Sequence, residues 1–264
     1  MIPDKRVPVL ARAYSLKREN ETLDTLYEGK LKLFQGRSGY RFSLDALLLA
    51  HFMTCRHGEK IADLGTGNGV IALILAYLHS SLSITGVEIQ LSMVDRARRN
   101  VRMNGFRERV TIIQADVRNI PEILSSESFA AVVCNPPYRQ ATSGRISPNA
   151  ERKIARHEIA GGLGDFLRAG AYVLPIKGRI ALVYPAVRVV DLLQSMRDAN
   201  LEPKRLRMVH SFADTNAALV LVEGVKGGKS GIEVVPPIII YKGGKEYTAE
   251  VAAMLAGRAT SAAC

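Results

Sequence analysis

Residues 61–76 read IADLGTGNGVIALILA. An apolar run reaches Asp63 and Leu64, a loop with glycine at 65, 67 and 69 follows, and a second apolar segment continues with helical length. A glycine-rich connection between a buried strand and a helix is typical of an open α/β sheet, which binds its ligand at that turn. Glycine lets the backbone turn sharply and approach a ligand closely. This stretch therefore predicts an α/β fold with a small-molecule site at the end of its first parallel strand.

The sequence beyond this stretch repeats the alternation of strand and helix. Short apolar runs predict strands near 60–64, 83–88, 110–115, 130–134, 179–184, 205–210 and 217–223. Segments of helical period predict helices near 69–79, 91–104, 149–173 and 187–199. This order predicts a mostly parallel seven-stranded sheet with helices on both faces. Because only SFADTN separates the last two strands, we expect them to form an antiparallel hairpin.

The two ends of the chain lie outside this alternation. We expect residues 1–50 to form an N-terminal extension of strands and a helix, with Ser43 as the N-cap of the helix that begins in GYRFSLDALLLAHF. Residues 51–247 then form the sheet domain, and residues 248–264 form a C-terminal tail of small residues.

Composition limits the classes of protein that the chain can represent. Its 264 residues, 47% of them hydrophobic, can bury one large core. Thirty-six basic and 25 acidic residues give a net charge of +11, which favours a polyanionic partner such as nucleic acid, or simply solubility. The three distant cysteines and five histidines show no disulfide or metal spacing, so we expect no metal and a reducing cytoplasm. No signal peptide or membrane span is predicted.

The residues around the glycine loop indicate which cofactor the sheet binds. A dinucleotide fingerprint requires Gly or Ala at the sixth position, where this chain has Val70. Asp63 would repel a pyrophosphate but suits a ligand with an ammonium or sulfonium group. Glu88, at the end of the second strand, is placed to accept from ribose hydroxyls, and Asp116, after the third, from an adenine amine.

Each acid alone is typical of a surface or capping residue, but three at successive strand ends predict S-adenosylmethionine. The expected cofactor-binding residues are Asp63, Gly65, Thr66, Gly67, Asn68, Gly69, Glu88, Ile89, Asp116, Val117 and Asn135.

AVVCNPPYRQ, residues 131–140, ends the fourth strand in a motif suited to a planar amine. The side-chain oxygen of Asn135 and the carbonyl of Pro136 can each accept one N–H of an exocyclic amine, aiming its lone pair at a methyl group. Proline stiffens both positions, so the acceptors need little reorganisation. Tyr138 can stack on the base. We expect Asn135, Pro136 and Tyr138 to be catalytic; a simple strand terminator is the alternative.

With these motifs the chain resembles class I S-adenosylmethionine-dependent methyltransferases, in the branch that carries Asn-Pro-Pro-Tyr and methylates amino or amide nitrogens. More narrowly, GYRFSLDALLLA, DLGTGNGVIAL, NPPY, ARHE and VPPIIIY together resemble the bacterial tRNA adenine-N6 methyltransferase family, over roughly residues 30–245. That family modifies the adenine beside the anticodon of one valine tRNA. The resemblance implies a Rossmann-like fold, S-adenosylmethionine as cofactor and a tRNA substrate. It also implies that the helix with Asp45 covers the cofactor, although a helix N-terminal charge is an equal alternative.

Basic residues and the second half of the Asn-Pro-Pro-Tyr motif are candidate RNA contacts. We expect substrate binding by Pro137, Tyr138, Arg139, Arg145, Lys204 and Arg205. Residues 151–156 equally fit a solvated helix face, and His157-Glu158 fits a structural role in that helix. Arg96, Arg98, Arg99 and Arg102 are expected on the exposed face of the second helix.

Several other functions stay open at this point. Guanine-N2 RNA methylation and glutamine-N5 protein methylation use the same motif, although the latter has less reason for the charge of +11. Cytosine-C5 chemistry needs a nucleophilic cysteine, and Cys134 is expected to be buried. Val70 and Asp63 disfavour a nicotinamide oxidoreductase. A non-catalytic RNA-binding protein with a relic pocket would need neither Asn135 nor the acids. The sequence does not distinguish a monomer from a homodimer.

Overall fold

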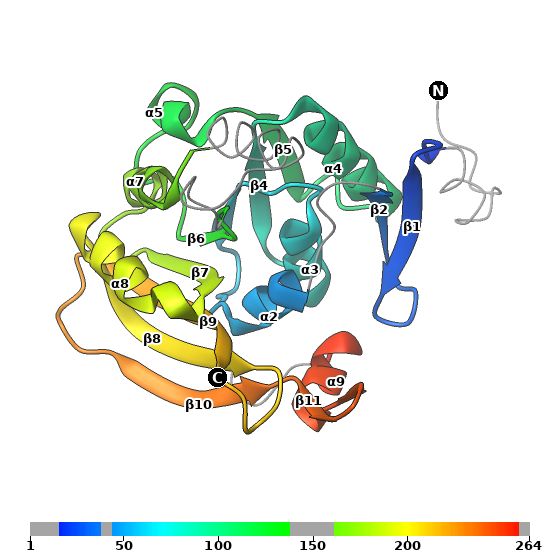
Figure 1. Ribbon diagram of the computed structural model, residues 1–264. Helices are drawn as coiled ribbons and strands as arrows, with labels where there is room; N and C mark the ends of the chain where they lie inside the picture. The colour runs from blue at the N-terminus through cyan, green and yellow to red at the C-terminus, as the bar shows by residue number, and fades with distance from the viewer. Residues whose placement is uncertain (1–15, 38–43, 138–160, 259–264) are drawn as a thin grey trace, which may run out of the picture.

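The computed structural model describes residues 16–37, 44–137 and 161–258 (Figure 1). Its centre is an eight-stranded sheet in the order β10-β8-β9-β7-β6-β3-β4-β5. The strands are β3 (Lys60–Leu64), β4 (Ser83–Glu88), β5 (Val110–Gln114), β6 (Ala131–Cys134), β7 (Arg179–Pro185), β8 (Leu201–His210), β9 (Ala217–Lys226) and β10 (Glu233–Ile239). The predicted α/β class and the mostly parallel sheet are confirmed.

The direction of the strands follows the lengths of their connections. Strands β5, β4, β3, β6 and β7 are parallel, whereas β9 runs antiparallel to both β7 and β8. The predicted hairpin of the last two strands is therefore present. The predicted count of seven strands was wrong, because β10 pairs in parallel with β8 as an eighth strand. Its sequence, EVVPPII, contains two prolines, which a strand tolerates at the edge of a sheet.

Helices cover the sheet on both faces, and each face has its own core. One core contains α2 (Leu44–Phe52), α3 (Val70–Leu78), α4 (Leu91–Met103) and α9 (Ala249–Leu255). The other contains α5 (Ile120–Ile123), α7 (Leu163–Val173) and α8 (Val189–Asp198). Successive side chains of a strand point to opposite faces, so Ile61 belongs to the first core and Ala62 to the second. This burial on both faces explains why the strands read as continuous apolar runs.

The helix predictions are confirmed with shifts of a residue or two, except for the one near 149–173. Its described part is α7, and residues 138–160 lie outside the described residues, as does Ser43. Two short 3-10 turns, η1 (Val117–Asn119) and η2 (Ala186–Arg188), precede α5 and α8. No helix in the described part of the chain is long and apolar enough to cross a membrane.

The ends of the described chain pack on the first face. A hairpin of β1 (Glu21–Leu26) and β2 (Leu31–Gly36) stands beside α4 (Figure 1). Beyond the sheet, the short strands β11 (Tyr241–Gly243) and β12 (Glu246–Tyr247) lead into α9. Val251 and Met254 of α9 are buried. This part of the predicted C-terminal tail, residues 248–264, therefore packs against α2.

Candidate functional site

The register of four parallel strands gathers the predicted site residues at one edge of the sheet. Leu64 of β3 pairs with Cys134 of β6 on one side and with Val87 of β4 on the other. Glu88 in turn pairs with Gln114 of β5. The residues that follow these strands therefore leave the sheet side by side at its carboxyl edge, where open α/β sheets bind their ligands.

The glycine loop turns over the end of β3 with left-handed backbone at its glycines. Gly65 has φ +72°, and a Cβ there would lie 2.8 Å from Cε1 of Phe166 on α7. Gly67 has φ +59°, but nothing lies within 4 Å of its would-be Cβ. The N–H groups of Gly65 and Thr66 both donate to the Val87 carbonyl, at 2.8 and 2.9 Å. The loop is thus closely packed at Gly65 and has open space at Gly67.

Asp63 is a completely buried carboxyl group at the base of this loop. Its Oδ2 accepts from the Thr66 hydroxyl at 2.6 Å. Its Oδ1, like the buried side-chain oxygen of Asn68, has no hydrogen-bond partner among the described residues. Burial, with a smaller contribution from the nearby charge of Glu88, raises the pKa of Asp63 to about 7 against the opposing effect of the Thr66 hydrogen bond.

These two acceptors fit a ligand that brings donors or positive charge, since a buried acceptor without a partner is costly. S-adenosylmethionine has an ammonium and a sulfonium group and lacks the phosphates that a carboxylate would repel. The residues present at the loop therefore fit this cofactor better than a dinucleotide.

Glu88 lies across the loop from Asp63 and is also buried. Its Oε2 accepts from the Gly67 N–H at 3.0 Å, and its Oε1 accepts from the Gln90 N–H at 2.8 Å. Burial raises the pKa of Glu88, while these backbone hydrogen bonds lower it. A carboxylate oxygen can accept more than one hydrogen bond, so Glu88 can hold the loop and still accept from ribose hydroxyls.

Asp116 follows β5 at the same edge, but its carboxylate already has a partner. It caps η1 by accepting from the Arg118 N–H at 2.9 Å, and its Oδ2 also accepts from Arg118 Nε at 2.9 Å. The Arg118 guanidinium holds the pKa of Asp116 below its usual value. The structure thus gives Asp116 the capping role that the sequence left as its alternative. Val117, the residue after Asp116, is buried, and Ile89, the residue after Glu88, is half-buried.

The Asn-Pro-Pro motif begins directly after β6. Asn135 and Pro137 are half-buried and Pro136 is buried. Cys134 is fully buried, and burial raises the pKa of its thiol, so this group packs in the core as expected. Tyr138, Arg139 and Arg145 lie outside the described residues.

The two predicted RNA contacts near β8 are bonded within the chain. Lys204 Nζ donates to the carbonyls of Lys229 and Gly231, at 3.1 and 2.7 Å. Arg205 donates to the Phe52 carbonyl, lies over the Phe52 ring at 4.3 Å and stands 3.6 Å from Glu223. The Arg205 guanidinium is thus held by residues of this chain and keeps 20% of its side chain exposed, so its contact with RNA stays a prediction. Sequence alone could not reveal this, because its partners come from α2 and β9.

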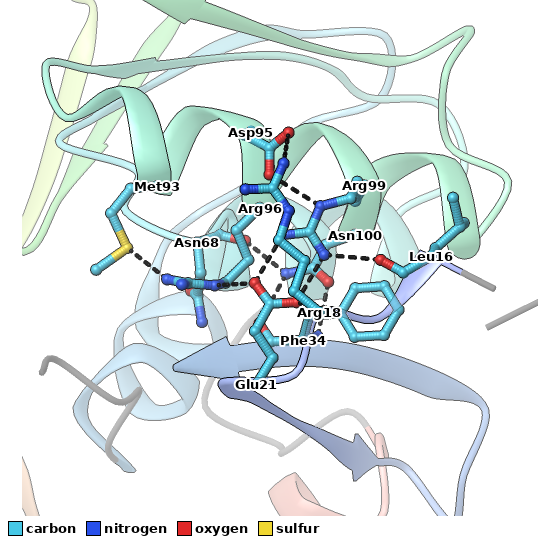
Figure 2. A network of polar contacts seen from close by, with 10 residues as sticks. All are labelled: Leu16, Arg18, Glu21, Phe34, Asn68, Met93, Asp95, Arg96, Arg99 and Asn100. Atoms are coloured by element: carbon cyan, nitrogen blue, oxygen red, sulfur yellow. Dashed lines mark hydrogen bonds and ion pairs between the residues drawn. The ribbon is translucent and has the colours of Figure 1, made fainter. Parts of the chain in front are cut away.

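The expected exposed face of α4 was also wrong for two of its arginines. Arg96 and Arg99 each leave 13% of the side chain exposed, because both bond to Glu21 of β1 (Figure 2). Arg98 donates to the Ile112 carbonyl. Sequence reasoning missed Glu21 and Asn100, which lie in this same network; the spacing of Asn100 and Asn104 by one helical turn was the available indication.

Comparisons with known proteins agree with this geometry. The methyltransferase small domain model matches residues 43–157. The tRNA1(Val) (adenine(37)-N6)-methyltransferase of Parabacteroides distasonis is 28% identical over 196 residues, which cover 74% of this chain and 80% of that protein. The protein of the same name from Haemophilus influenzae strain PittGG is 30% identical over 162 residues, covering 61% of this chain and 68% of the relative.

Other relatives with that name align over smaller shares, 49% to 65% of their own length. Among solved structures, a predicted O-methyltransferase from Agrobacterium tumefaciens superposes with a TM-score of 0.68 at 23% identity, over 81% of this chain and 97% of that one. This last likeness concerns the fold.

Proposed function

This chain belongs to the tRNA1(Val) (adenine(37)-N6)-methyltransferase family, and we propose that it methylates the exocyclic N6 amine of an adenine in tRNA. The adenine at position 37 of the valine tRNA named in its relatives is the proposed target. The observation that carries the proposal is the pairing of Leu64 with Cys134, which sets the glycine loop beside Asn135-Pro136.

S-adenosylmethionine, when bound, supplies an electrophilic methyl group. Asp63 and Asn68 offer their buried side-chain oxygens to the positively charged part of this cofactor, and Glu88 accepts from its ribose. Because Glu88 also holds the Gly67 N–H, a ligand on this carboxylate is tied to the position of the loop.

Asn135 and Pro136 act on the amine. An adenine amine is a poor nucleophile because its lone pair is delocalised into the ring. The Asn135 side-chain carbonyl and the Pro136 backbone carbonyl each accept a hydrogen bond from one of its two N–H groups. They hold the nitrogen in a geometry that aims its lone pair at the methyl group. After transfer the nitrogen is acidic and loses its proton to water, so the site needs no strong base.

The remaining substrate contacts follow from the positions in the chain. Tyr138 comes three residues after Asn135 and is proposed to stack on the target base, worth roughly 1–3 kcal/mol. Arg139 and Arg145 are proposed to contact phosphates beside that base. Pro137 lies between the two acceptors and Tyr138 and is proposed to contact the substrate, with its fixed φ limiting the backbone conformations at that position. The Lys204 ammonium uses two of its three N–H donors on the carbonyls of Lys229 and Gly231, and the third is proposed to contact an RNA phosphate.

The test is methyl transfer from labelled S-adenosylmethionine into tRNA from cells that lack the modification, followed by nucleoside digestion. We expect wild-type protein to give N6-methyladenosine and Asn135→Ala to lose at least about 100-fold in kcat. Cofactor affinity of the variant should stay within a few-fold. Cys134→Ala is the matched control, since this neighbour is buried in the core and should cost stability with little loss of kcat per folded molecule.

Two results would contradict the proposal. Label found in N2-methylguanosine would keep the mechanism of Asn135 and replace the base. If the cofactor binds but no label enters RNA, the next substrate to test is a glutamine amide of a protein. If no label enters protein either, the pocket binds the cofactor without catalysis.

A further inference from the structure

The outer edge of β2 is paired by the side chains of Asn100 in α4 and of Asn104, the C-cap residue of that helix. Asn104 accepts from the Lys32 N–H at 2.9 Å and donates to the Lys32 carbonyl at 2.7 Å. Asn100 does the same for Phe34, at 2.7 and 3.2 Å. Two asparagines thus take the place of a partner strand, which this edge lacks within the described part of the chain.

This pairing works because the two repeats match in length. Four residues of helix rise about 6 Å, and two residues of strand rise about 6.6–6.8 Å. Side chains one helical turn apart therefore meet every second residue of a strand that runs alongside. Each primary amide has a donor and an acceptor, as a strand backbone does.

Asn100 differs from Asn104 in where its second N–H goes. Asn100 Nδ2 also donates to the backbone carbonyl of Asn68 in the glycine loop, at 2.9 Å (Figure 2). The second N–H of Asn104 goes instead to the Asn100 carbonyl within α4, at 2.8 Å. Asn100 is fully buried, so one side chain joins the N-terminal hairpin to the cofactor loop with no competing water.

The strand next to β2 is fixed to the same helix by Glu21. Its carboxylate, 1% exposed, accepts from Arg99 at 2.6 and 2.7 Å and from Arg96 at 2.9 Å (Figure 2). The Arg99 guanidinium also lies over the Phe34 ring, 5.3 Å from its centroid. The hairpin is therefore held against α4 at the level of Asn100, close to the loop that Asn100 contacts.

We propose that Asn100 is a positioning residue for the cofactor. It fixes the backbone of Asn68, and through it the glycine loop, against the N-terminal hairpin, so that hairpin docking and cofactor binding stabilise each other. This inference rests on the cofactor site described above and not on the identity of the methylated base. Its test therefore uses cofactor binding alone.

Two variants of α4 separate the loop contact from hairpin docking. Asn100→Leu and Asn104→Leu each remove one donor and one acceptor from the edge of β2, but only the first removes the bond to Asn68. Calorimetric titration with S-adenosylmethionine should give a Kd about tenfold higher for Asn100→Leu. For Asn104→Leu the Kd should stay within about twofold of wild type.

Asn100→Ala adds neither bulk nor buried charge and serves if the leucine variant does not fold. It cannot donate to Asn68, so we expect the same rise in Kd. In methylation assays the KM for the cofactor should rise with the KM for tRNA unchanged, which distinguishes this role from a failure of the proposed substrate.

Hydrogen exchange gives a second readout that general destabilisation would not move. Because coupling is reciprocal, adding S-adenosylmethionine should slow exchange of the β1–β2 amides in wild type and in Asn104→Leu. The slowing should be lost in the Asn100 variants at saturating cofactor. Folded Asn100 variants with wild-type Kd, or an equal rise in Kd for both leucine variants, would overturn the proposal.

Discussion

Leu64 and Cys134 are paired across two parallel strands, and this single register sets the glycine loop beside the proposed amine acceptors. Gly65 follows the first of these residues and Asn135 follows the second. A shift of one residue in this pairing would turn every side chain of β6 to the other face of the sheet. Both strands are buried on both faces, so such a shift would require the cores on both sides of the sheet to repack.

The packing of Gly65 against Phe166 predicts unequal effects within the glycine loop. Gly65→Ala places a Cβ 2.8 Å from the ring and also strains a backbone at φ +72°, so we expect a loss of about 2–4 kcal/mol in unfolding free energy. Gly67→Ala meets no neighbour and should lose only about 1–2 kcal/mol from its φ.

Chemical denaturation of both variants measures this difference. Adding Phe166→Leu to Gly65→Ala should recover the part due to the ring and leave the part due to φ. Equal losses for the two alanine variants would show that the ring of Phe166 moves aside freely.

The buried carboxyl of Asp63 predicts a change of stability with pH. Its pKa of about 7 in the folded protein exceeds the ordinary value of 3.8, so between these values the folded state keeps a proton that the unfolded state has lost. Stability of the cofactor-free protein therefore falls as pH rises through this window. Asp63→Asn removes that loss, so above pH 7 its free energy of unfolding should exceed that of the wild type by ~2 kcal/mol or more.

The same substitution should weaken binding of the cofactor. Wild-type affinity for S-adenosylmethionine should fall as pH drops below about 7, because protonation removes the charge that attracts the ammonium group. Asp63→Asn should bind weakly with less dependence on pH. Melting curves and calorimetry at pH 6 to 8.5 measure both effects, with exposed Asp214→Asn as control. A pH-independent wild-type Kd would contradict the assignment.

Glu21 predicts acid release of the N-terminal hairpin. Burial raises the pKa of Glu21, but hydrogen bonds from Arg99, Arg96 and the Arg18 backbone lower it to about 2, below the ordinary value of 4.5. The stabilisation is thus complete above pH 4.5 and is lost as pH falls towards 2. Glu21→Gln should cost about 1–3 kcal/mol of hairpin docking at neutral pH.

Hydrogen exchange of β1 and β2 at pH 7 and near pH 3 measures this loss, with exposed Glu19→Gln as control. Unchanged protection in Glu21→Gln would mean that the two asparagines of α4 suffice to dock the hairpin.

Arg205 separates a structural from an RNA-binding role. Arg205→Met leaves Glu223 without its nearby charge and the Phe52 carbonyl without its donor, so we expect a loss of stability of about 1–3 kcal/mol. The KM for tRNA should stay within twofold of wild type. A large rise in that KM with unchanged stability would instead support Arg205 as an RNA contact.

Much of the fold could be read from local pattern. The strands predicted near 60–64 and 83–88 agree with β3 and β4 at both ends, because an apolar run bounded by turn residues marks its own limits. The edge strand β10 could not be predicted in this way. Its residues are mostly exposed, and its pairing with β8 depends on a neighbour some thirty residues away in the chain.

By itself the sequence determined the α/β alternation, the glycine loop between a strand and a helix, the acids at three strand ends and the Asn-Pro-Pro holder after the fourth. These features depend on residues within a few positions of one another, and their chemistry is local. Only the tertiary structure decided which charged and polar side chains form hydrogen bonds or ion pairs within the chain. Arg99 meets Glu21 and Asn100 meets Asn68 because docking of the hairpin brings together segments that are far apart in the chain. No local pattern encodes such a partner, because each of these polar side chains would be equally stable exposed to water if the hairpin docked elsewhere.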